Sequence, residues 1–408
     1  MRILIHGINY APELTGIGKY TGEMAEWLAK RGHDVHVLTA LPYYPEWSVH
    51  KDYSGKRWHT ELLNGVQVHR VPLYVPKDVS SLKRILHEFS FLLSTIPYWI
   101  KFLFSKKFDV VFCIAPPFHL AAFPWLYKKL KKSFWINHIQ DLQVDAAKDL
   151  QMIKNQSLLK FMFNLERFFL VQGDKVSTIS SGMEQKIINK GIDKSRMLYF
   201  PNWVDSEVIF PLPQSQSLRA EMGFSDDDKI ILYSGNLGEK QGLDAVINIA
   251  RKFISDSKIQ FVISGSGGGK EKLVQLANKY ELTNVHFFPL QPYEKLSALL
   301  AMADLHLVLQ KSSAADLVMP SKLTGILAAG GCAIVTASPG TTLYDTVNQF
   351  KMGILVEPDN EAELEIGIRN GLLADIEIYK HNAREYAKKY LEKDNILLKF
   401  QSDVESLI

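Results

Sequence analysis

Cysteine is almost absent from this sequence, since only Cys113 and Cys332 occur among 408 residues. Each lies inside an apolar run, where a thiol is typically buried. Two such thiols exclude a disulfide framework, and their separation excludes the paired spacing that is typical of zinc sites. The cysteine content therefore indicates a reducing compartment.

The sequence also lacks a long uninterrupted apolar run. Its most apolar segment, residues 82–104, is broken by His87, Glu88, Pro97 and Lys101, whereas a membrane-spanning helix needs about 20 predominantly apolar residues. The first residues lead straight into a predicted strand and show no charged, apolar and small-residue cleavage pattern. We therefore expect a cytoplasmic protein.

Neither acidic nor basic residues are scarce, but the two kinds are unevenly distributed along the sequence. Basic residues outnumber acidic ones by 27 to 18 in residues 1–205, and acidic residues outnumber basic ones by 26 to 20 in residues 206–408. Nucleic acid, an anionic bilayer or an acidic substrate would each attract a basic half. Nucleic acid is the least favoured of the three, because no signature of a nucleic-acid-binding module occurs.

Cations lie on both sides of the apolar segment 82–104 and continue as far as Lys132. Apolar and aromatic residues beside cations are typical of a helix that lies at an anionic membrane surface. A buried helix with a solvated basic end is the plain alternative. The first reading predicts a peripheral position on the inner face of the cell membrane.

Length and hydrophobic periodicity predict two α/β domains. A chain of 408 residues exceeds what one hydrophobic core usually supports. Residues 1–39 read as a strand, a turn-rich loop, a helix with one apolar face and a second strand, which is a unit that stacks into a parallel sheet. Strand and helix patterns then alternate to residue 356, so that both halves are expected to be doubly wound.

The domain boundary is expected near a segment with paired prolines and a polar tail, residues 208–217. We assign residues 1–205 to an N-terminal Rossmann-like domain and residues 206–384 to a C-terminal one. The charged helical stretch 385–408 is expected to pack back on the N-terminal domain.

Ligands of doubly wound sheets bind beyond the carboxyl ends of the strands, and the loop 9–18 occupies that place in the first half. Gly16 and Gly18 allow close backbone approach, and a helix start attracts anions. The loop is not a dinucleotide fingerprint, because no G-x-G-x-x-G follows the strand and no acid ends the next strand. A plain structural turn is the alternative.

Three glycine-rich or helix-starting motifs occur in the second half. Residues 264–270 (SGSGGGK) follow a strand, but their spacing does not match that of a P-loop. The remaining interpretation is a glycine-rich turn that contacts a nucleotide through its backbone. Residues 233–244 bring Lys240 to a helix start, and residues 319–322 (MPSK) bring Lys322 to another. Two lysines and two helix N-termini would balance the charge of a departing diphosphate, although each lysine alone is more often a solvated surface charge.

His138 and Asp141 form an H-x-x-D pair at the end of the predicted strand 134–139. A histidine there can hydrogen-bond a sugar hydroxyl, and a nearby aspartate can orient the ring or the substrate. A structural histidine is the alternative reading. Paired carboxylates of the retaining-hydrolase type are not evident, and no acidic pair is placed to hold a metal, so we expect no cofactor and no metal.

Together these stretches resemble the retaining nucleotide-sugar glycosyltransferases of family 4, which have the GT-B fold of two Rossmann-like domains facing each other across a cleft. Within that family the sequence is most similar to the exopolysaccharide enzymes of the colanic acid, WcaI-like type. The resemblance covers nearly the whole chain and rests on these segments: NYAPELTGIGKYTGEMAEWLAKRGHDVHVLT, NHIQDLQVDA, FPNWVD, YSGNLGEKQGLD and MPSKLTGILAAGG.

The resemblance implies roles for individual residues. The N-terminal domain would bind the acceptor and the C-terminal domain the donor, with His138 beside the donor sugar and Asp141 near it. The residues implied in donor binding are Gly16, Gly18, Asn202, Gly235, Asn236, Lys240, Gly265, Ser266, Gly267, Pro320, Ser321 and Lys322.

The sequence also departs from the family pattern. The arginine of the family's G-R…K-G motif is Asn236 here, and its lysine falls one residue early at Lys240. The family's two glutamates, eight residues apart, would fall at Leu317 and Gly325. The departure leaves no carboxylate from the C-terminal domain to hold the donor sugar, so that Lys322 and backbone amides would carry more of the binding.

The resemblance therefore implies a hexosyltransferase that moves a sugar from a nucleoside-diphosphate sugar, with GDP-fucose favoured, to a saccharide acceptor. The acceptor is expected to be linked to a polyprenyl diphosphate, and the sugar to move with retention by front-face substitution. Two alternatives stay open: a nucleotide-sugar 2-epimerase of the same fold, and a non-catalytic nucleotide-sugar-binding subunit.

Overall fold

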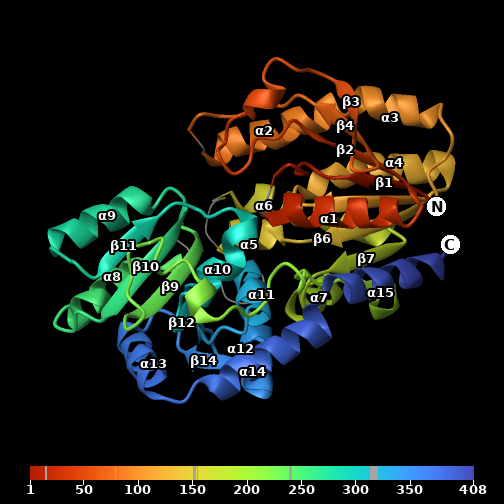
Figure 1. Ribbon diagram of the computed structural model, residues 1–408. Coiled ribbons are helices and arrows are strands. Elements are labelled where there is room, and N and C mark those ends of the chain that lie inside the picture. Colours follow the sequence, from red (N-terminus) through yellow and green to blue (C-terminus); the bar gives the residue numbers. More distant parts are fainter. Residues whose placement is uncertain (14–15, 79, 150–152, 154, 239–240, 313–319) are drawn as a thin grey trace. The chain divides into compact units, whose positions relative to one another are not determined.

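The chain divides into two compact units in the computed structural model, which describes residues 1–13, 16–78, 80–149, 153, 155–238, 241–312 and 320–408 (Figure 1). Unit 1 consists of Met1–Pro201 together with Leu397–Ile408, and unit 2 consists of Asn202–Ile396. The chain therefore passes from one unit to the other twice.

Unit 1 is built on an eight-stranded sheet with the strand order β3-β4-β2-β1-β5-β6-β7-β8. The strands are β1 (Arg2–His6), β2 (Asp34–Ala40), β3 (His59–Leu63), β4 (Val66–Val71), β5 (Val110–Ala115), β6 (Phe134–Ile139), β7 (Lys175–Thr178) and β8 (Met197–Tyr199). All neighbours pair in parallel except β3, which pairs antiparallel with β4 at the sheet edge. The sequence reading missed β3, because its side chains are half-buried or exposed and mostly polar.

The helices of unit 1 are α1 (Gly16–Lys30), α2 (Ser81–Ser94), α3 (Ile96–Leu103), α4 (Ala122–Lys131), α5 (Gln143–Asp149), α6 (Gln156–Gln172), α7 (Ser181–Asn189) and most of α15 (Lys393–Glu405), which begins in unit 2. The apolar segment 82–104 is thus two consecutive helices rather than one. They are separated at Thr95, and Pro97 lies in the first turn of α3, where a proline does not remove a needed backbone hydrogen bond. Among the described residues, no helix is both long and apolar enough to cross a bilayer.

Unit 2 is built on a six-stranded parallel sheet with the order β11-β10-β9-β12-β13-β14. Its strands are β9 (Lys229–Asn236), β10 (Ile259–Ser266), β11 (Val285–Phe288), β12 (Leu305–Val308), β13 (Ala333–Thr336) and β14 (Gly353–Val356). Its helices are α8 (Asp244–Ala250), α9 (Lys270–Lys279), α10 (Leu296–Ala301), α11 (Ser321–Ala328), α12 (Thr342–Phe350), α13 (Glu361–Leu373) and α14 (Glu377–Tyr386).

The central strand of unit 2 shows why its sequence is almost continuously apolar. Ile230 and Leu232 pack into one hydrophobic cluster, and Ile231 and Tyr233 pack into a second one. Successive side chains of a strand point to opposite faces, so that both faces of β9 are buried. A parallel sheet that is covered on both sides requires this pattern.

Two segments differ from the sequence prediction. Residues 208–217 are not a free linker, because Ile209 is 1% exposed within a core cluster of unit 2 and Phe210 N donates to Ser297 Oγ at 3.2 Å. The stretch 385–408 is not one helix either. It passes through a π-helical turn at Ala387–Leu391 and is interrupted by extended Glu392, where Val204 forms a β-bridge.

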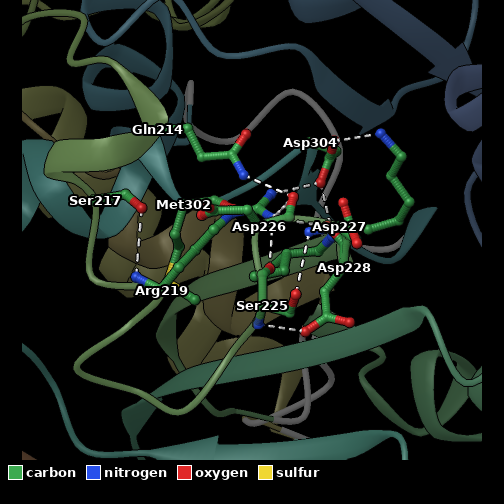
Figure 2. A network of polar contacts seen from close by, with 11 residues as sticks. Gln214, Ser217, Arg219, Ser225, Asp226, Asp227, Asp228, Met302 and Asp304 are labelled. Carbon is green, nitrogen blue, oxygen red and sulfur yellow. Dashed lines mark hydrogen bonds and ion pairs between the residues drawn. The ribbon is translucent and has the colours of Figure 1, made fainter.

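A buried arginine joins the beginning of unit 2 to its sheet (Figure 2). Arg219 is 4% exposed. Its guanidinium donates to the carbonyl oxygens of Met302 at 2.9 Å and Asp228 at 2.7 Å, and to Asp304 Oδ2 at 2.8 Å. The same Asp304 oxygen accepts from Ile230 N at 2.8 Å. Arg219 therefore fixes residues 219–228 against the start of β9 and the loop before β12.

We expect Arg219→Ala to lower the free energy of unfolding of unit 2 by about 3 kcal/mol, because it leaves buried acceptors and Asp304 without a partner. For a unit of this size the midpoint of thermal unfolding would fall by about 6 to 12 °C. Lys229→Ala is the matched control, since Lys229 reaches the same Asp304 at 3.3 Å from an exposed position and should cost less than about 1 kcal/mol. Equal shifts of the thermal midpoint in the two variants would contradict the role of Arg219 in holding unit 2 together.

Candidate functional site

Several of the residues predicted to bind the donor in unit 2 lie at the point where its strand order reverses. From β9 the chain moves outward to β10 and β11, and then returns to the other side of β9 as β12. Ligands of open α/β sheets bind at such a switch point, beyond the carboxyl ends of the strands. Gly235 and Asn236 end β9, Gly265 and Ser266 end β10, and Pro320 precedes α11, the next described helix after β12.

Lys322 lies over the end of β9, in the first turn of α11. Its Nζ donates to Tyr233 Oη at 2.7 Å and lies 3.9 Å from the centroid of the Tyr233 ring. Tyr233 Oη in turn donates to the carbonyl oxygen of Asn236 at 2.7 Å. A Cβ atom at Gly235 would lie 3.7 Å from Lys322 Nζ. The lysine, the tyrosine and the Gly235 turn therefore form one continuous group.

Burial lowers the pKa of Lys322 to about 7, because removal from water disfavours the charged ammonium. Among the residues that the structure describes, no carboxylate is a partner of this nitrogen. An arriving phosphate would supply the missing negative charge. The first amides of a helix also lack partners within the helix, so the start of α11 favours an anion at the same place.

The two glycine-rich loops of unit 2 pack directly on each other. Leu237 N donates to the carbonyl oxygen of Ser266, and Gly269 N donates to that of Leu237, both at 2.8 Å. A Cβ atom at Gly265 would overlap the carbonyl oxygen of Gly235, and one at Gly267 would lie 2.5 Å from Asn236 Oδ1. These glycines are therefore required for loop packing, whether or not they also touch a nucleotide.

We expect Gly265→Ala to separate these loops, to lower the thermal midpoint and to weaken nucleotide binding by about tenfold or more, because the new methyl group would meet backbone that cannot yield. Gly268→Ala is the matched control, since nothing lies within 4 Å of a Cβ atom there. Isothermal titration with nucleoside diphosphates would measure both affinities. Equal affinities in the two variants would contradict the importance of this packing.

In unit 1 the loop after β1 also lies at a switch point, because the strand order reverses at β1. Glu13 is 5% exposed and holds this loop together. Its carboxylate accepts from the amides of Tyr43 and Tyr44 at 3.0 Å each, and from Asn9 Nδ2 at 2.8 Å. Burial raises the pKa of the Glu13 carboxyl, and these hydrogen bonds oppose that rise.

The two predicted glycines of this loop have different environments. A Cβ atom at Gly18 would lie 2.9 Å from Glu13 Oε2, so this glycine is needed to make room for the buried glutamate. Gly16 has φ +58° and nothing within 4 Å of a Cβ atom. Only Gly16 therefore leaves open space at the start of α1, and contact of either residue with a ligand stays a prediction.

His138 is the fifth residue of β6 and is 2% exposed. Its Nδ1 lies 2.9 Å from Ser177 Oγ, and its ring stacks on Phe112 with centroids 5.2 Å apart. Phe400 of α15 completes this aromatic cluster by stacking on Phe200 at 3.8 Å. Burial lowers the pKa of His138 to about 3, so that the imidazole is neutral near pH 7.

The other predicted residues are placed as follows. Asp141 follows β6 and is half-buried, with an interaction partner. Asn202 is half-buried and is the first residue of unit 2. Ser321 is exposed at the start of α11. Lys240 lies outside the described residues, as does Leu317, whereas Gly325 lies within α11. Contact of any of these residues with a substrate stays a prediction.

Sequence reasoning missed Tyr233 and Glu13. Tyr233 reads as an ordinary core residue in an apolar strand, and only the fold brings Lys322 onto its hydroxyl. Glu13 binds amides that lie 30 and 31 residues further along the chain, so that no local pattern reveals its role. Within the described ranges, no three side chains of His, Cys, Asp or Glu are grouped as metal ligands.

Comparison with known proteins gives full-length matches. Residues 15–203 match the glycosyl transferase 4-like domain, and residues 214–390 match glycosyl transferases group 1. The chain is 44% identical over 414 residues to WcaI of Escherichia coli (strain K12), named as a colanic acid biosynthesis glycosyl transferase, with 99% of this chain and 100% of that protein covered.

Solved structures share the fold over the whole chain. Sucrose-phosphate synthase from Thermosynechococcus elongatus superposes with a TM-score of 0.77 at 17% identity, covering 100% of this chain and 98% of that one. Anabaena Alr3699/HepE in complex with UDP-glucose superposes with a TM-score of 0.72 at 15% identity, covering 100% of both chains. The GT-B fold class predicted from the sequence is therefore confirmed, and the chain belongs to the group 1 and type 4-like glycosyltransferases, as a relative of WcaI.

Proposed function

We propose that this glycosyltransferase moves a sugar from a nucleoside-diphosphate sugar to a saccharide acceptor during synthesis of an exopolysaccharide of the colanic acid type. Identity of 44% to WcaI over nearly the full chain supports the pathway. The complex of HepE with UDP-glucose supports a nucleotide sugar as the donor. We propose GDP-fucose as the first donor to test, and a polyprenyl-diphosphate-linked saccharide as the acceptor, met at the inner face of the cell membrane.

The observation that carries this proposal is the position of Lys322. It is a half-buried lysine in the first turn of α11, at the switch point of unit 2, and its ammonium donates to a tyrosine hydroxyl. Charge grows on the diphosphate as the sugar leaves, and a preorganised cation and helix N-terminus stabilise that charge. This position supports the proposal that unit 2 binds the donor; we propose unit 1 for the acceptor.

We propose that the sugar moves with retention of its anomeric configuration. The leaving phosphate takes part in removing the acceptor proton as the new glycosidic bond forms on the same face. His138, as a neutral imidazole, contacts the sugar while positive charge develops on the sugar ring. Asp141 orients the substrate. Asn202 and the Gly16 turn complete the donor contacts, with Lys240 as a second cation.

Turnover with a panel of nucleotide sugars tests this proposal and separates it from its rivals. A transferase releases nucleoside diphosphate only when a saccharide acceptor is present, and the product keeps the anomeric configuration of the donor. Release without an acceptor, together with a rearranged free sugar, would identify a 2-epimerase instead. Binding of nucleotide sugars without any release, under conditions in which the chain is folded, would identify a binding subunit.

We expect EDTA to change the transfer rate by no more than about twofold, since Lys322 and the α11 amides are proposed to carry the charge balance that a metal ion supplies in other phosphoryl-leaving reactions. The measurement is the initial rate of nucleotide release after dialysis against EDTA, with and without added Mg²⁺. If EDTA abolished activity and Mg²⁺ restored it, the metal-free charge balance would be contradicted. The proposed transfer reaction would not be affected by that result.

A further inference from the structure

The helices α2 and α3 each expose a row of large apolar side chains on unit 1. Figure 1 shows the two helices following one another along the same side of the unit. Their exposed large apolar side chains recur at helical spacing, with exposed fractions from 36% to 88%. We call this set the α2–α3 stripe, and it consists of Leu82, Ile85, Leu86, Phe89, Leu93, Ile96, Ile100 and Phe104.

The opposite side of the same helices forms part of the core. Phe91, Tyr98, Trp99 and Phe102 are between 0% and 8% exposed and belong to the hydrophobic cluster of unit 1. The α2–α3 stripe is therefore not needed to hold the helices onto the sheet. Soluble proteins rarely expose contiguous apolar patches larger than a few hundred Å², and larger ones mark interaction sites.

The charge around the α2–α3 stripe selects the kind of partner. Between residues 81 and 107 the one acidic residue is Glu88, which is 7% exposed and accepts two hydrogen bonds from Gln143 Nε2. The exposed cations Arg84, Lys101, Lys106 and Lys107 lie toward the two ends of the stripe, and Arg84 also contacts Glu88 Oε1 at 3.4 Å. A second copy docked on this surface would set cations against cations, whereas an anionic bilayer complements them.

The edge of this surface also fits an interface between lipid and water. Trp58 is 47% exposed and donates from Nε1 to the carbonyl oxygen of Ser94, the last residue of α2, at 2.7 Å. Tryptophan is enriched at the level of lipid headgroups, where its ring is half in an apolar environment. The indole nitrogen therefore lies at the end of α2, at the residue that follows Leu93 of the stripe in the sequence.

Two lysines of the wider basic segment that the sequence suggested have partners within unit 1, whereas Lys129 and Lys132 of that segment are exposed. Lys128 Nζ donates to Asp174 Oδ1 at 2.7 Å. Lys131 Nζ donates to the carbonyl oxygens of Leu103 and Ser105 at 3.0 and 3.2 Å. These two lysines fasten α4 to its neighbours. The cations that remain exposed at the carboxyl end of α3 are Lys101, Lys106 and Lys107.

We propose that the α2–α3 stripe is a docking surface for an anionic lipid bilayer, with the apolar side chains entering the headgroup boundary and the flanking cations contacting lipid phosphates. The inference rests on the proposed function in one respect, since a lipid-linked acceptor is the reason for such a surface. Its physical basis is the combination of an exposed apolar helix face with an excess of exposed cations beside it.

Sedimentation of the full chain with lipid vesicles tests the proposal. The wild-type protein is expected to bind vesicles of phosphatidylcholine with phosphatidylglycerol at low salt, and to bind phosphatidylcholine alone much more weakly. Leu82→Asn combined with Leu93→Asn should weaken binding by about tenfold or more. Lys106→Gln combined with Lys107→Gln should weaken it by about fivefold for each cation removed, and Lys106→Arg with Lys107→Arg should restore it.

The matched control replaces two exposed apolar residues of α13 in unit 2. Ile366 and Leu373 are 56% and 88% exposed, and Ile366→Asn with Leu373→Asn should leave vesicle binding unchanged. Wild-type protein that ignores anionic vesicles, or stripe variants that bind as the wild type does, would overturn the proposal. A lipid-free dimer that Leu82→Asn with Leu93→Asn dissociates would assign the stripe to a second copy instead.

Turnover with a short lipid-free saccharide acceptor keeps this test separate from that of the proposed function. Docking variants should transfer the sugar to such an acceptor at the wild-type rate, because the stripe takes no part in the chemistry. Absence of turnover in every protein, wild type included, would count against the proposed function and leave the vesicle result to decide the docking surface by itself.

Discussion

Replacing Lys322 with methionine is expected to lower turnover by about 100-fold or more and to remove the pH dependence of nucleotide binding. Lys322 is half-buried, and the pKa of about 7 means that it loses its proton near neutrality. A diphosphate beside it would favour the charged form and raise that pKa in the complex. Nucleotide affinity in the wild type should then be highest below pH 7.

The sign of the effect follows from which form binds the diphosphate. Below pH 7 the free protein already carries the proton, so that affinity is at its maximum. As the pH rises above 7, binding must take up a proton, and affinity should fall by up to about tenfold per pH unit until the pKa of the complex is reached. In Lys322→Met this slope should disappear, and affinity at pH 6 should be about 30-fold weaker or worse.

Isothermal titration of nucleoside diphosphate between pH 6 and pH 9, in buffers of different ionisation enthalpy, measures both affinity and proton uptake. Lys270→Met is the matched control, since Lys270 begins the neighbouring helix α9 and should keep the wild-type slope. Proton uptake that persists in Lys322→Met would show that another group carries the linkage. Tyr233→Phe removes the hydroxyl that holds Lys322 and should shift the midpoint of the pH dependence.

His138→Ala is the second variant for which a large loss is expected, with turnover lower by about 100-fold or more. Nucleotide affinity should change little, because the proposed contact of His138 is with the sugar and not with the diphosphate. The ring is buried and neutral, so its contribution would come from a fixed dipole and a hydrogen bond rather than from a positive charge. The measurements are the transfer rate at saturating donor and the dissociation constant of the nucleoside diphosphate.

Loss of packing alone must be distinguished from loss of a catalytic contact. His6 offers a matched control, because it ends β1 in unit 1, is 0% exposed and lies in an aromatic cage with Phe91 and Trp99. His6→Ala and His138→Ala should lower the thermal midpoint to a similar extent, since each empties a buried site. Equal losses of turnover in the two variants would contradict the special role of His138.

The regular strands could be predicted because their sequences are dictated by burial on both faces. Residues 230–233 are apolar without interruption, and the structure shows each of them at 0% or 1% exposed. The edge strand β3 could not be predicted in this way, because it is half-covered and its alternation is blurred by polar residues. The prolines near residue 211 resembled a linker, since nothing local indicates that Ile209 is buried under α10.

The approximate positions of the candidate donor loops were also predictable, because glycines and helix starts at strand ends recur in any doubly wound sheet. Their internal chemistry was not. The hydrogen bond from Lys322 to Tyr233 joins residues that are 89 positions apart, and the packing of Gly265 on Gly235 depends on the register of β10 against β9. Such pairings are properties of the assembled sheet, and a single sequence carries no local signal for them.

The return of the chain to unit 1 at Leu397 has a consequence for how the protein is made. During translation the last strands of unit 2 leave the ribosome before Phe400 does, so unit 2 has all its residues while unit 1 still lacks its closing helix. At that stage Phe400 does not yet contact Phe200 and Phe112, as it does in the finished protein. Both of these rings lie beside His138. Domains generally fold as units in the order of synthesis. Unit 1 would here be the first unit to begin folding and the last to complete it.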